Sequence, residues 1–110
     1  CNMFGDILSD EAAQQIGGLG MAPGANIGDN FALFEPIHGS APDIAGLGIA
    51  NPISMILSVA MMLRESFGET TGAEYIEHAV HQTLLAGVLT KDLGGQASLS
   101  EMTEAIIRHL

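Results

Sequence analysis

Basic residues are scarce in this sequence. Its 110 residues include three lysines and arginines against thirteen aspartates and glutamates, which gives a formal net charge of −10. The three cations, Arg64, Lys91 and Arg108, are far apart along the chain. A protein that binds the phosphate backbone of a nucleic acid needs clustered lysine and arginine side chains. The sequence therefore predicts no nucleic-acid partner.

Cysteines and long hydrophobic runs are also lacking. The single cysteine, Cys1, cannot form an internal disulfide, and no leader sequence precedes the first motif, so we expect a cytoplasmic protein. The most apolar run, from Pro52 to Leu63, contains two serines and is shorter than the roughly 20 residues that span a bilayer. We therefore expect no membrane span. Because the chain begins at Cys1 and not at methionine, we also expect it to be part of a longer protein.

Hydrophobic residues and glycines, in contrast, are plentiful. The hydrophobic share is 47% and there are fourteen glycines, a composition that fits a mixed α/β domain, or part of one, better than a helical bundle. Periodicity predicts a helix over residues 6–16, a buried strand over 31–34, a helix from Pro52 to Phe67, and helices that open at Thr71 and Ser98. Two capping boxes are predicted, Thr71 with Glu74 and Ser98 with Glu101, and Asn51 before Pro52 is a further helix cap.

A long irregular segment lies between the predicted strand and the helix at Pro52. The eighteen residues "EPIHGSAPDIAGLGIANP" hold three prolines and three glycines, and loops of this length usually bind something. Backbone N–H groups there could hold a phosphate without basic side chains. Asp43 could hydrogen-bond an adenosine ribose and would repel a 2′-phosphate, which favours NAD over NADP if a dinucleotide binds. The alternative is a crossover loop whose glycines serve geometry alone.

Two acidic residues, Asp6 and Asp10, are four residues apart in the first predicted helix. Their Cβ atoms would lie about 6 Å apart on one face, close enough to share a hard cation such as Mg²⁺ or Mn²⁺. From spacing alone, the simpler interpretation is that Asp6 caps the helix and Asp10 is solvated near its N-terminus. His78 and His81 lie off the apolar stripe of their helix, so we expect a solvated pair and not a metal site.

Two motifs together resemble those of a known enzyme family. "NMFGDILSDEAA" and "EPIHGSAPDIAGLGIANP" are similar to the metal-site and cofactor-loop signatures of the decarboxylating β-hydroxyacid dehydrogenases, which include isopropylmalate, isocitrate, homoisocitrate and tartrate dehydrogenases. The resemblance covers essentially the whole chain and corresponds to the C-terminal part of such an enzyme. It implies an α/β fold, part of a two-domain architecture with a mixed sheet flanked by helices. Residues 1–30 would end the dimer-forming, metal-site domain, and residues 31–110 would return into the cofactor-binding domain.

The resemblance also implies roles for the metal pair and for part of the loop. Asp6 and Asp10 would hold Mg²⁺ or Mn²⁺, which chelates the hydroxyl and carboxylate of the substrate and assists hydride loss and decarboxylation. Glu35 would lie towards the nicotinamide, His38 would contact the adenine, and Asn51 would reach the adenine edge.

The remaining cofactor residues follow from the same motif. Gly39, Ser40 and Ala41 would line the phosphates and ribose with backbone groups, and Asp43 would hold the adenosine ribose with Ile44 beside it. NADP-dependent relatives carry a lysine and a tyrosine in place of Asp43 and Ile44, so the resemblance also implies NAD.

The implied reaction is the NAD-dependent oxidative decarboxylation of a 2-hydroxy dicarboxylic acid. We expect 3-isopropylmalate, with isocitrate, homoisocitrate or tartrate as alternatives and a non-catalytic regulatory subunit on the same scaffold as a rival. The catalytic tyrosine and lysine, the arginines that grip the substrate and a third metal-binding aspartate are not in these residues. We therefore expect no activity from the 110 residues alone, and a homodimer or homotetramer as the full enzyme.

Overall fold

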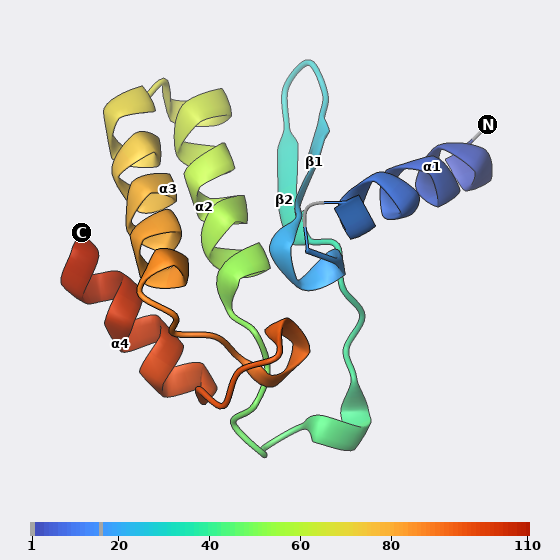
Figure 1. The fold of residues 1–110 in the computed structure, drawn as a ribbon. Helices are drawn as coiled ribbons and strands as arrows, with labels where there is room; N and C mark the ends of the chain where they lie inside the picture. The colour runs from blue at the N-terminus through green and yellow to red at the C-terminus, as the bar shows by residue number, and fades with distance from the viewer. Residues whose placement is uncertain (1, 16) are drawn as a thin grey trace.

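The described residues form a small helical body with a hairpin and one projecting helix. The computed structural model describes residues 2–15 and 17–110, without the side chains of residues 2 and 6. The elements, in chain order, are α1 (Asn2–Gln15), η1 (Leu19–Met21), β1 (Pro23–Ile27), β2 (Ala32–Pro36), η2 (Pro42–Ile44), α2 (Ile53–Phe67), α3 (Thr70–Leu85), η3 (Lys91–Leu93) and α4 (Leu99–His109). In Figure 1, α2, α3 and α4 lie side by side, the β1–β2 hairpin flanks α2, and α1 points away from the bundle.

The core lies between α2, α3 and α4. It is built from Ile53, Ala79, Val80, Met102 and Ile106, whose exposed fractions are 4% or less. These residues recur at helical spacing, as the periodicity predicted, so each helix turns one apolar face inward. His78 and His81 are exposed, as expected for residues off that stripe. In the part of the chain that the structure describes, none of the helices is long and apolar enough to cross a membrane.

Two buried serines explain why α2 is not uniformly apolar. The Ser54 hydroxyl donates a hydrogen bond to the carbonyl oxygen of Ala22, at the junction of η1 and β1. The Ser58 hydroxyl donates to the carbonyl oxygen of Ser54 at 2.8 Å, so neither polar group is left unpaired. Ser54 thereby fixes α2 against the segment that leads into the hairpin.

The β1–β2 hairpin is antiparallel and pairs Pro23 with Pro36 at one end and Ile27 with Ala32 at the other. The strand expected at residues 31–34 exists as β2, but its predicted burial is wrong. Phe31, just before the strand, is 88% exposed and Leu33 is 56% exposed. Both strands contact α2, so only one face of the hairpin is covered by the described residues.

The helix ends agree with local sequence signals at some sites and not at others. The backbone N–H of Ile53 donates to Oδ1 of Asn51 at 3.0 Å, so Asn51 caps α2 as predicted, and α2 ends at Gly68 with φ of +69°. The box predicted for Thr71 and Glu74 is wrong. Only two residues separate α2 from α3, which begins at Thr70 with Glu69 at its N-cap. Thr71 therefore lies inside the helix and cannot cap it.

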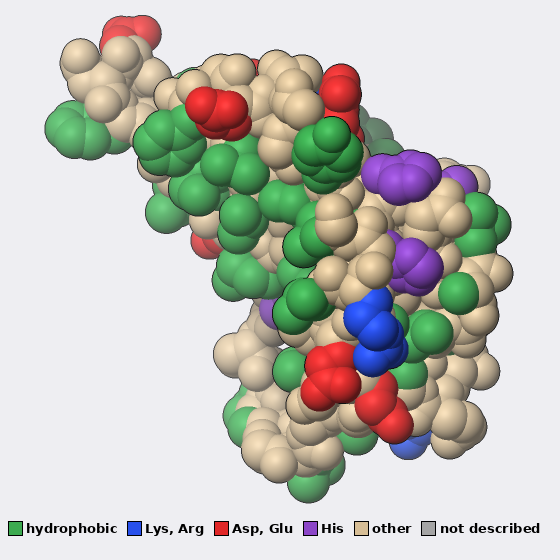
Figure 2. Space-filling model, turned by 90° about the vertical axis from the view of Figure 1, so that its left-hand side faces the viewer, with side chains coloured by type: hydrophobic (Ala, Val, Ile, Leu, Met, Phe, Trp, Pro, Cys, Tyr) green, Lys and Arg blue, Asp and Glu red, His purple; other side chains and the backbone are tan. Residues whose placement is uncertain are grey.

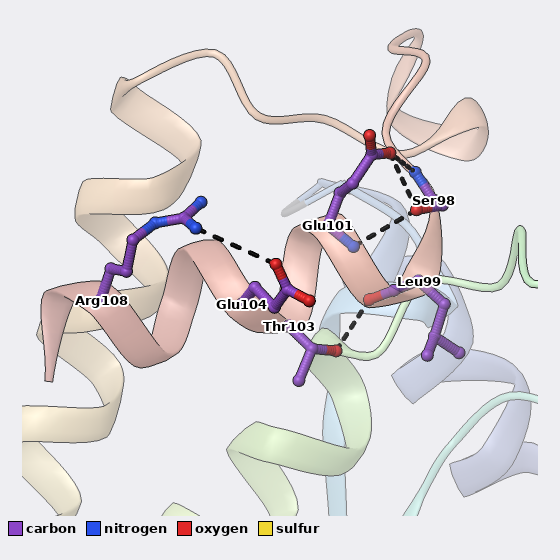
Figure 3. A network of polar contacts seen from close by, with 6 residues as sticks. All are labelled: Ser98, Leu99, Glu101, Thr103, Glu104 and Arg108. Atoms are coloured by element: carbon purple, nitrogen blue, oxygen red, sulfur yellow. Dashed lines mark hydrogen bonds and ion pairs between the residues drawn. The ribbon is translucent and has the colours of Figure 1, made fainter.

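The capping box of α4 is confirmed, and Figure 3 shows it. The Ser98 hydroxyl accepts from the backbone N–H of Glu101 at 3.2 Å, and the backbone N–H of Ser98 donates to the Glu101 carboxylate at 2.8 Å. The Ser98 hydroxyl also donates to the Glu101 carboxylate at 2.8 Å, and the hydrogen bonds that this carboxylate accepts from the Ser98 backbone and side chain lower the pKa of Glu101. Further along the same helix, Glu104 and Arg108 form an exposed ion pair at 4.0 Å.

A bidentate ion pair joins α2 to α3. The two terminal nitrogens of Arg64 donate to the two carboxylate oxygens of Glu77 at 2.7 and 2.8 Å. The hydrogen bonds from Arg64 lower the pKa of Glu77, and those to Glu77 raise the pKa of Arg64. The pair is about 40% exposed, so it supports the packing of the two helices without dominating it.

Candidate cofactor pocket

The irregular segment after β2 forms one wall of an open pocket of about 850 Å³. That volume lies within the roughly 300–1,000 Å³ typical of sites for small molecules and cofactors. In Figure 1, the loop around η2 and the turn containing η3 both lie below the bundle, on the side where α2 begins. The wall residues are Gly20, His38, Gly39, Ser40, Ala41, Ile44, Ala45, Gly46, Gly48, Ile49, Ala50, Asn51, Lys91, Asp92 and Leu99.

Left-handed backbone angles and a hydrogen bond to α4 define the shape of the loop after β2. Ala41 has φ of +40° and ψ of +62°, a left-handed conformation that costs a residue with a Cβ about 1 kcal/mol or more. Gly46 and Gly48 have φ of +79° and +66°, which glycine adopts without strain. The backbone N–H of Leu99 then donates to the carbonyl oxygen of Gly48 at 2.8 Å. The first residue of α4 thereby anchors the far end of the loop.

Six of the eight predicted cofactor residues lie in the pocket wall: His38, Gly39, Ser40, Ala41, Ile44 and Asn51. Nδ1 of His38 lies 2.9 Å from the carbonyl oxygen of Gly39, the geometry in which a protonated Nδ1 donates. Glu35 and Asp43 are exposed and lie outside the wall. Asp43 is nonetheless adjacent to it, because it sits in η2 next to Ile44. The role of each residue towards a ligand stays a prediction.

Four residues of the pocket wall were not predicted from the sequence: Gly20, Lys91, Asp92 and Leu99. They come from η1, from η3 and from the first position of α4, which are distant in sequence from the loop. The segment "TKDLGG" (residues 90–95) forms a turn, with η3 followed by Gly94 at φ of +82°. No local pattern, however, indicates that this turn faces residues 38–51.

Asn51 joins three of these segments. Besides capping α2, its Nδ2 donates to Oδ2 of Asp92 at 3.0 Å and lies 3.8 Å from the sulfur of Met21. The hydroxyl of Thr90, which is fully buried, donates to Oδ1 of Asp92 at 2.6 Å. The Asp92 side chain is therefore held from both sides while it remains exposed to the pocket.

The predicted metal pair is described only in part. Asp10 is exposed on α1, and the side chain of Asp6 lies outside the described residues. Asp10 is not part of the pocket wall. Among the His, Cys, Asp and Glu side chains that the structure describes, no group of three or more is arranged to hold a metal ion. The pairing of Asp6 with Asp10 therefore stays a prediction.

The surface charge agrees with the sparse basic composition. Figure 2 shows one face of the molecule, on which the few lysine and arginine side chains lie beside acidic ones and hydrophobic side chains gather elsewhere. Lys91 is the one lysine of the sequence, and it lies at the rim of the pocket. An anionic ligand there would meet the ammonium group of Lys91 and the backbone N–H groups of the loop.

The comparison with protein families gives a direct result. The family model "Isocitrate/isopropylmalate dehydrogenase" matches residues 1–106. The chain belongs to the isocitrate/isopropylmalate dehydrogenase family. The predicted resemblance is thereby confirmed.

Individual relatives of the isocitrate/isopropylmalate dehydrogenase family show the same relationship. A 3-isopropylmalate dehydrogenase of Streptococcus thermophilus is 69% identical, with 99% of this chain and 32% of the relative aligned. An isocitrate/homoisocitrate dehydrogenase of Thermus thermophilus is 57% identical over the same shares. The crystal structure of isocitrate dehydrogenase from Methylococcus capsulatus superposes with a TM-score of 0.90 at 53% identity, covering 96% of this chain and 32% of that one. The α/β fold class is confirmed, and the chain spans about one third of the length of these relatives.

Proposed function

We propose that the protein at its natural length catalyses the NAD-dependent oxidative decarboxylation of 3-isopropylmalate. The observation that carries the proposal is the pocket, in which six predicted cofactor residues come together in a chain 69% identical to a 3-isopropylmalate dehydrogenase. Isocitrate or homoisocitrate is the second candidate substrate, because a relative named for both is 57% identical. The reaction would need residues beyond these 110, since they lack the expected catalytic tyrosine and lysine.

The pocket fits the adenosine and phosphate part of a dinucleotide. Its volume of about 850 Å³ is sufficient, and the left-handed turn at Ala41 presents backbone and not bulky side chains to the ligand. Lys91 adds one positive charge at the rim. Asp43 favours NAD over NADP, because it is exposed, precedes the wall residue Ile44 in the chain, and carries a carboxylate that would repel a 2′-phosphate. When bound, NAD would supply the hydride acceptor.

The cation site belongs to α1. Asp6 and Asp10 are one helical turn apart, and their carboxylate oxygens are the donors that Mg²⁺ or Mn²⁺ prefers. A cation held there would supply Lewis acidity to the hydroxyl and carboxylate of the substrate. The aspartates themselves would orient the cation and contribute the negative charge that retains it.

The same helix supports a homodimer, or a homotetramer built from dimers. Met3, Phe4, Ile7 and Leu8 are each more than half exposed on α1, which projects from the body in Figure 1. An exposed apolar face of this kind is typical of a protein–protein interface. A second copy of the chain would cover it.

The test is a steady-state assay of the protein at its natural length. NADH formation is expected with 3-isopropylmalate, NAD and Mg²⁺, with much less activity when NADP replaces NAD or when a chelator removes the cation. Asp10→Asn should raise the cation concentration required for half-maximal activity, whereas Asp29→Asn, in the turn between β1 and β2, serves as the matched control. Turnover of isocitrate but not 3-isopropylmalate would move the assignment to the second candidate. An absence of NADH formation with any of these acids would refute the proposal.

A further inference from the structure

Gly24 of β1 lies directly opposite Glu35 of β2, at the end of the hairpin from which the pocket loop leaves. A Cβ on Gly24 would lie 3.1 Å from the carbonyl oxygen of Glu35 and 3.4 Å from Cγ1 of Ile37. Ordinary van der Waals contacts of a Cβ begin at 3.4 Å. The space that a side chain would occupy at position 24 is therefore already filled by β2 and by the residue that follows it.

The β1 side of this contact is the anchored side. The carbonyl oxygen of Ala22, two residues before Gly24, accepts a hydrogen bond from the buried hydroxyl of Ser54 on α2. Residues 37–40, all within the described part of the chain, make no hydrogen bond to a helix or strand. A Cβ at position 24 would therefore displace the end of β2 and the residues after it, and not the strand that carries the Cβ.

The hairpin itself offers little resistance to that displacement. The pair next to Gly24 and Glu35 is Pro23 with Pro36, and proline has no backbone N–H to donate. The hydrogen-bonded ladder is therefore weak where the chain leaves β2, and close packing against Gly24 takes its place.

The residues that would move lead directly into the pocket. Ile37 precedes His38, the first residue of the loop that lies in the pocket wall. Glu35 is exposed just before this segment. The fit of Ile37 against Gly24 therefore determines the point at which the chain enters the wall.

We propose that Gly24 is a positioning residue of the cofactor site: its missing side chain lets the end of β2 close onto β1, and this sets the places of Glu35 and His38. The inference rests on the proposed use of NAD. It adds a residue that lies outside the pocket wall and controls the shape of that wall.

The experiment measures NAD binding and turnover by Gly24→Ala in the protein at its natural length. The new Cβ requires a shift of 0.3 Å, the difference between 3.1 Å and 3.4 Å. A misplacement of about 1 Å can cost about 100-fold in activity, so on the same scale the KM for NAD should rise about fourfold. The dissociation constant of NAD from calorimetry should rise by the same factor. Partial unfolding would lower the apparent kcat and leave the KM of the folded enzyme unchanged, so the KM separates positioning from loss of stability.

Gly28→Ala is the matched control, at the opposite end of the same hairpin. Its Cβ would lie 3.3 Å from the carbonyl oxygen of Phe31, again a close contact with backbone. It should lower the urea unfolding midpoint about as much as Gly24→Ala does, with the KM for NAD unchanged. A KM that does not change in Gly24→Ala, or that rises equally in both variants, would overturn the inference.

Ile37→Ala tests the contact from its other side. It removes Cγ1, so Gly24→Ala should raise the KM by a smaller factor in the Ile37→Ala background than in the wild type. Ile37→Ala alone should also raise the KM, because the chain before His38 loses its packing. Equal factors in both backgrounds, or an unchanged KM in Ile37→Ala, would refute the contact as the cause.

The proposed function and this inference fail in different ways. A wild type that reduces NAD, with variants whose affinity for NAD is unchanged, would refute the role of Gly24 and leave the reaction standing. A wild type that neither binds nor reduces NAD would refute the proposed function and this inference with it.

Discussion

Gly95 gives the sharpest test of the packing that supports the pocket. A Cβ placed on this residue would lie 1.9 Å from the carbonyl oxygen of Leu89, 2.4 Å from its carbonyl carbon and 2.5 Å from its Cβ. Real Cβ contacts are essentially never shorter than 3.0 Å, so Gly95→Ala must open this gap by at least 1.1 Å, the difference between 1.9 and 3.0 Å. Two of the three atoms belong to the backbone, and no side-chain rotation can relieve the clash.

The cost of Gly95→Ala follows from what must move. The turn is closed by hydrogen bonds from Gly95 N–H to Thr90 and from Ala97 N–H to Leu89, each 2.9 Å long. Overpacking costs about 1–3 kcal/mol and each lost hydrogen bond about 1 kcal/mol, so we expect a loss of about 3–5 kcal/mol. Because the turn carries Asp92, the KM for NAD should also rise.

The assay combines urea unfolding with amide hydrogen exchange. Gly95→Ala should lower the unfolding midpoint and accelerate exchange at the amide of Ala97. Gly72→Ala is the control. Gly72 lies inside α3, and a Cβ there would make only an ordinary 3.7 Å contact with the side chain of Leu63 on α2. This substitution should be neutral or stabilise the fold by up to about 1 kcal/mol. Equal stability of Gly95→Ala and the wild type would refute the reasoning.

Three further substitutions test helix ends and helix contacts. Ser98→Ala removes the cap of α4 and should cost about 1 kcal/mol in urea unfolding, whereas Ser100→Ala, in the same first turn, should cost much less. Ser54→Ala leaves a backbone carbonyl without its buried donor and should cost about 1–3 kcal/mol; an unchanged midpoint would contradict the role assigned to that hydroxyl. Glu77→Gln should lower the melting temperature at neutral pH, because Arg64 lowers the pKa of Glu77 in the folded state. The stabilisation by the Arg64–Glu77 pair is fully present above pH 4.5, the ordinary pKa of a glutamate, and is lost as the pH falls through the lowered pKa of Glu77. The melting temperatures of Glu77→Gln and the wild type should therefore converge in acid, and a difference that stays constant with pH would refute this role of the pair.

Local features of the fold were predictable from the sequence. The stripe that places Val80 and Met102 in the core depends on helical spacing, and the Ser98–Glu101 box depends on residues three apart. The capping box wrongly predicted at Thr71 and Glu74 shows the limit of this reasoning. The motif is present in the sequence, but α3 begins at Thr70, so Thr71 lies inside the helix and cannot cap it. The burial of Phe31 was mispredicted for a related reason, since burial depends on what covers the hairpin.

The pocket was predictable only on the side that one segment builds. Proline and glycine spacing marked residues 35–52 as a binding loop, and the resemblance assigned roles within it. Gly20 and Asp92 contribute to the wall only because η1 and η3 are brought to the loop by tertiary packing. The hydrogen bond from Asn51 to Asp92 spans 41 residues, a separation at which no local pattern operates.

The hydrogen bond from Leu99 to Gly48 has a consequence for how ligand occupancy could be observed. It links the rim of the cavity to the first residue of α4, so tightening of the rim would slow local opening of the later turns of α4, which are not part of the pocket wall. A spectroscopic label near Leu110 could therefore serve as a remote sensor of saturation.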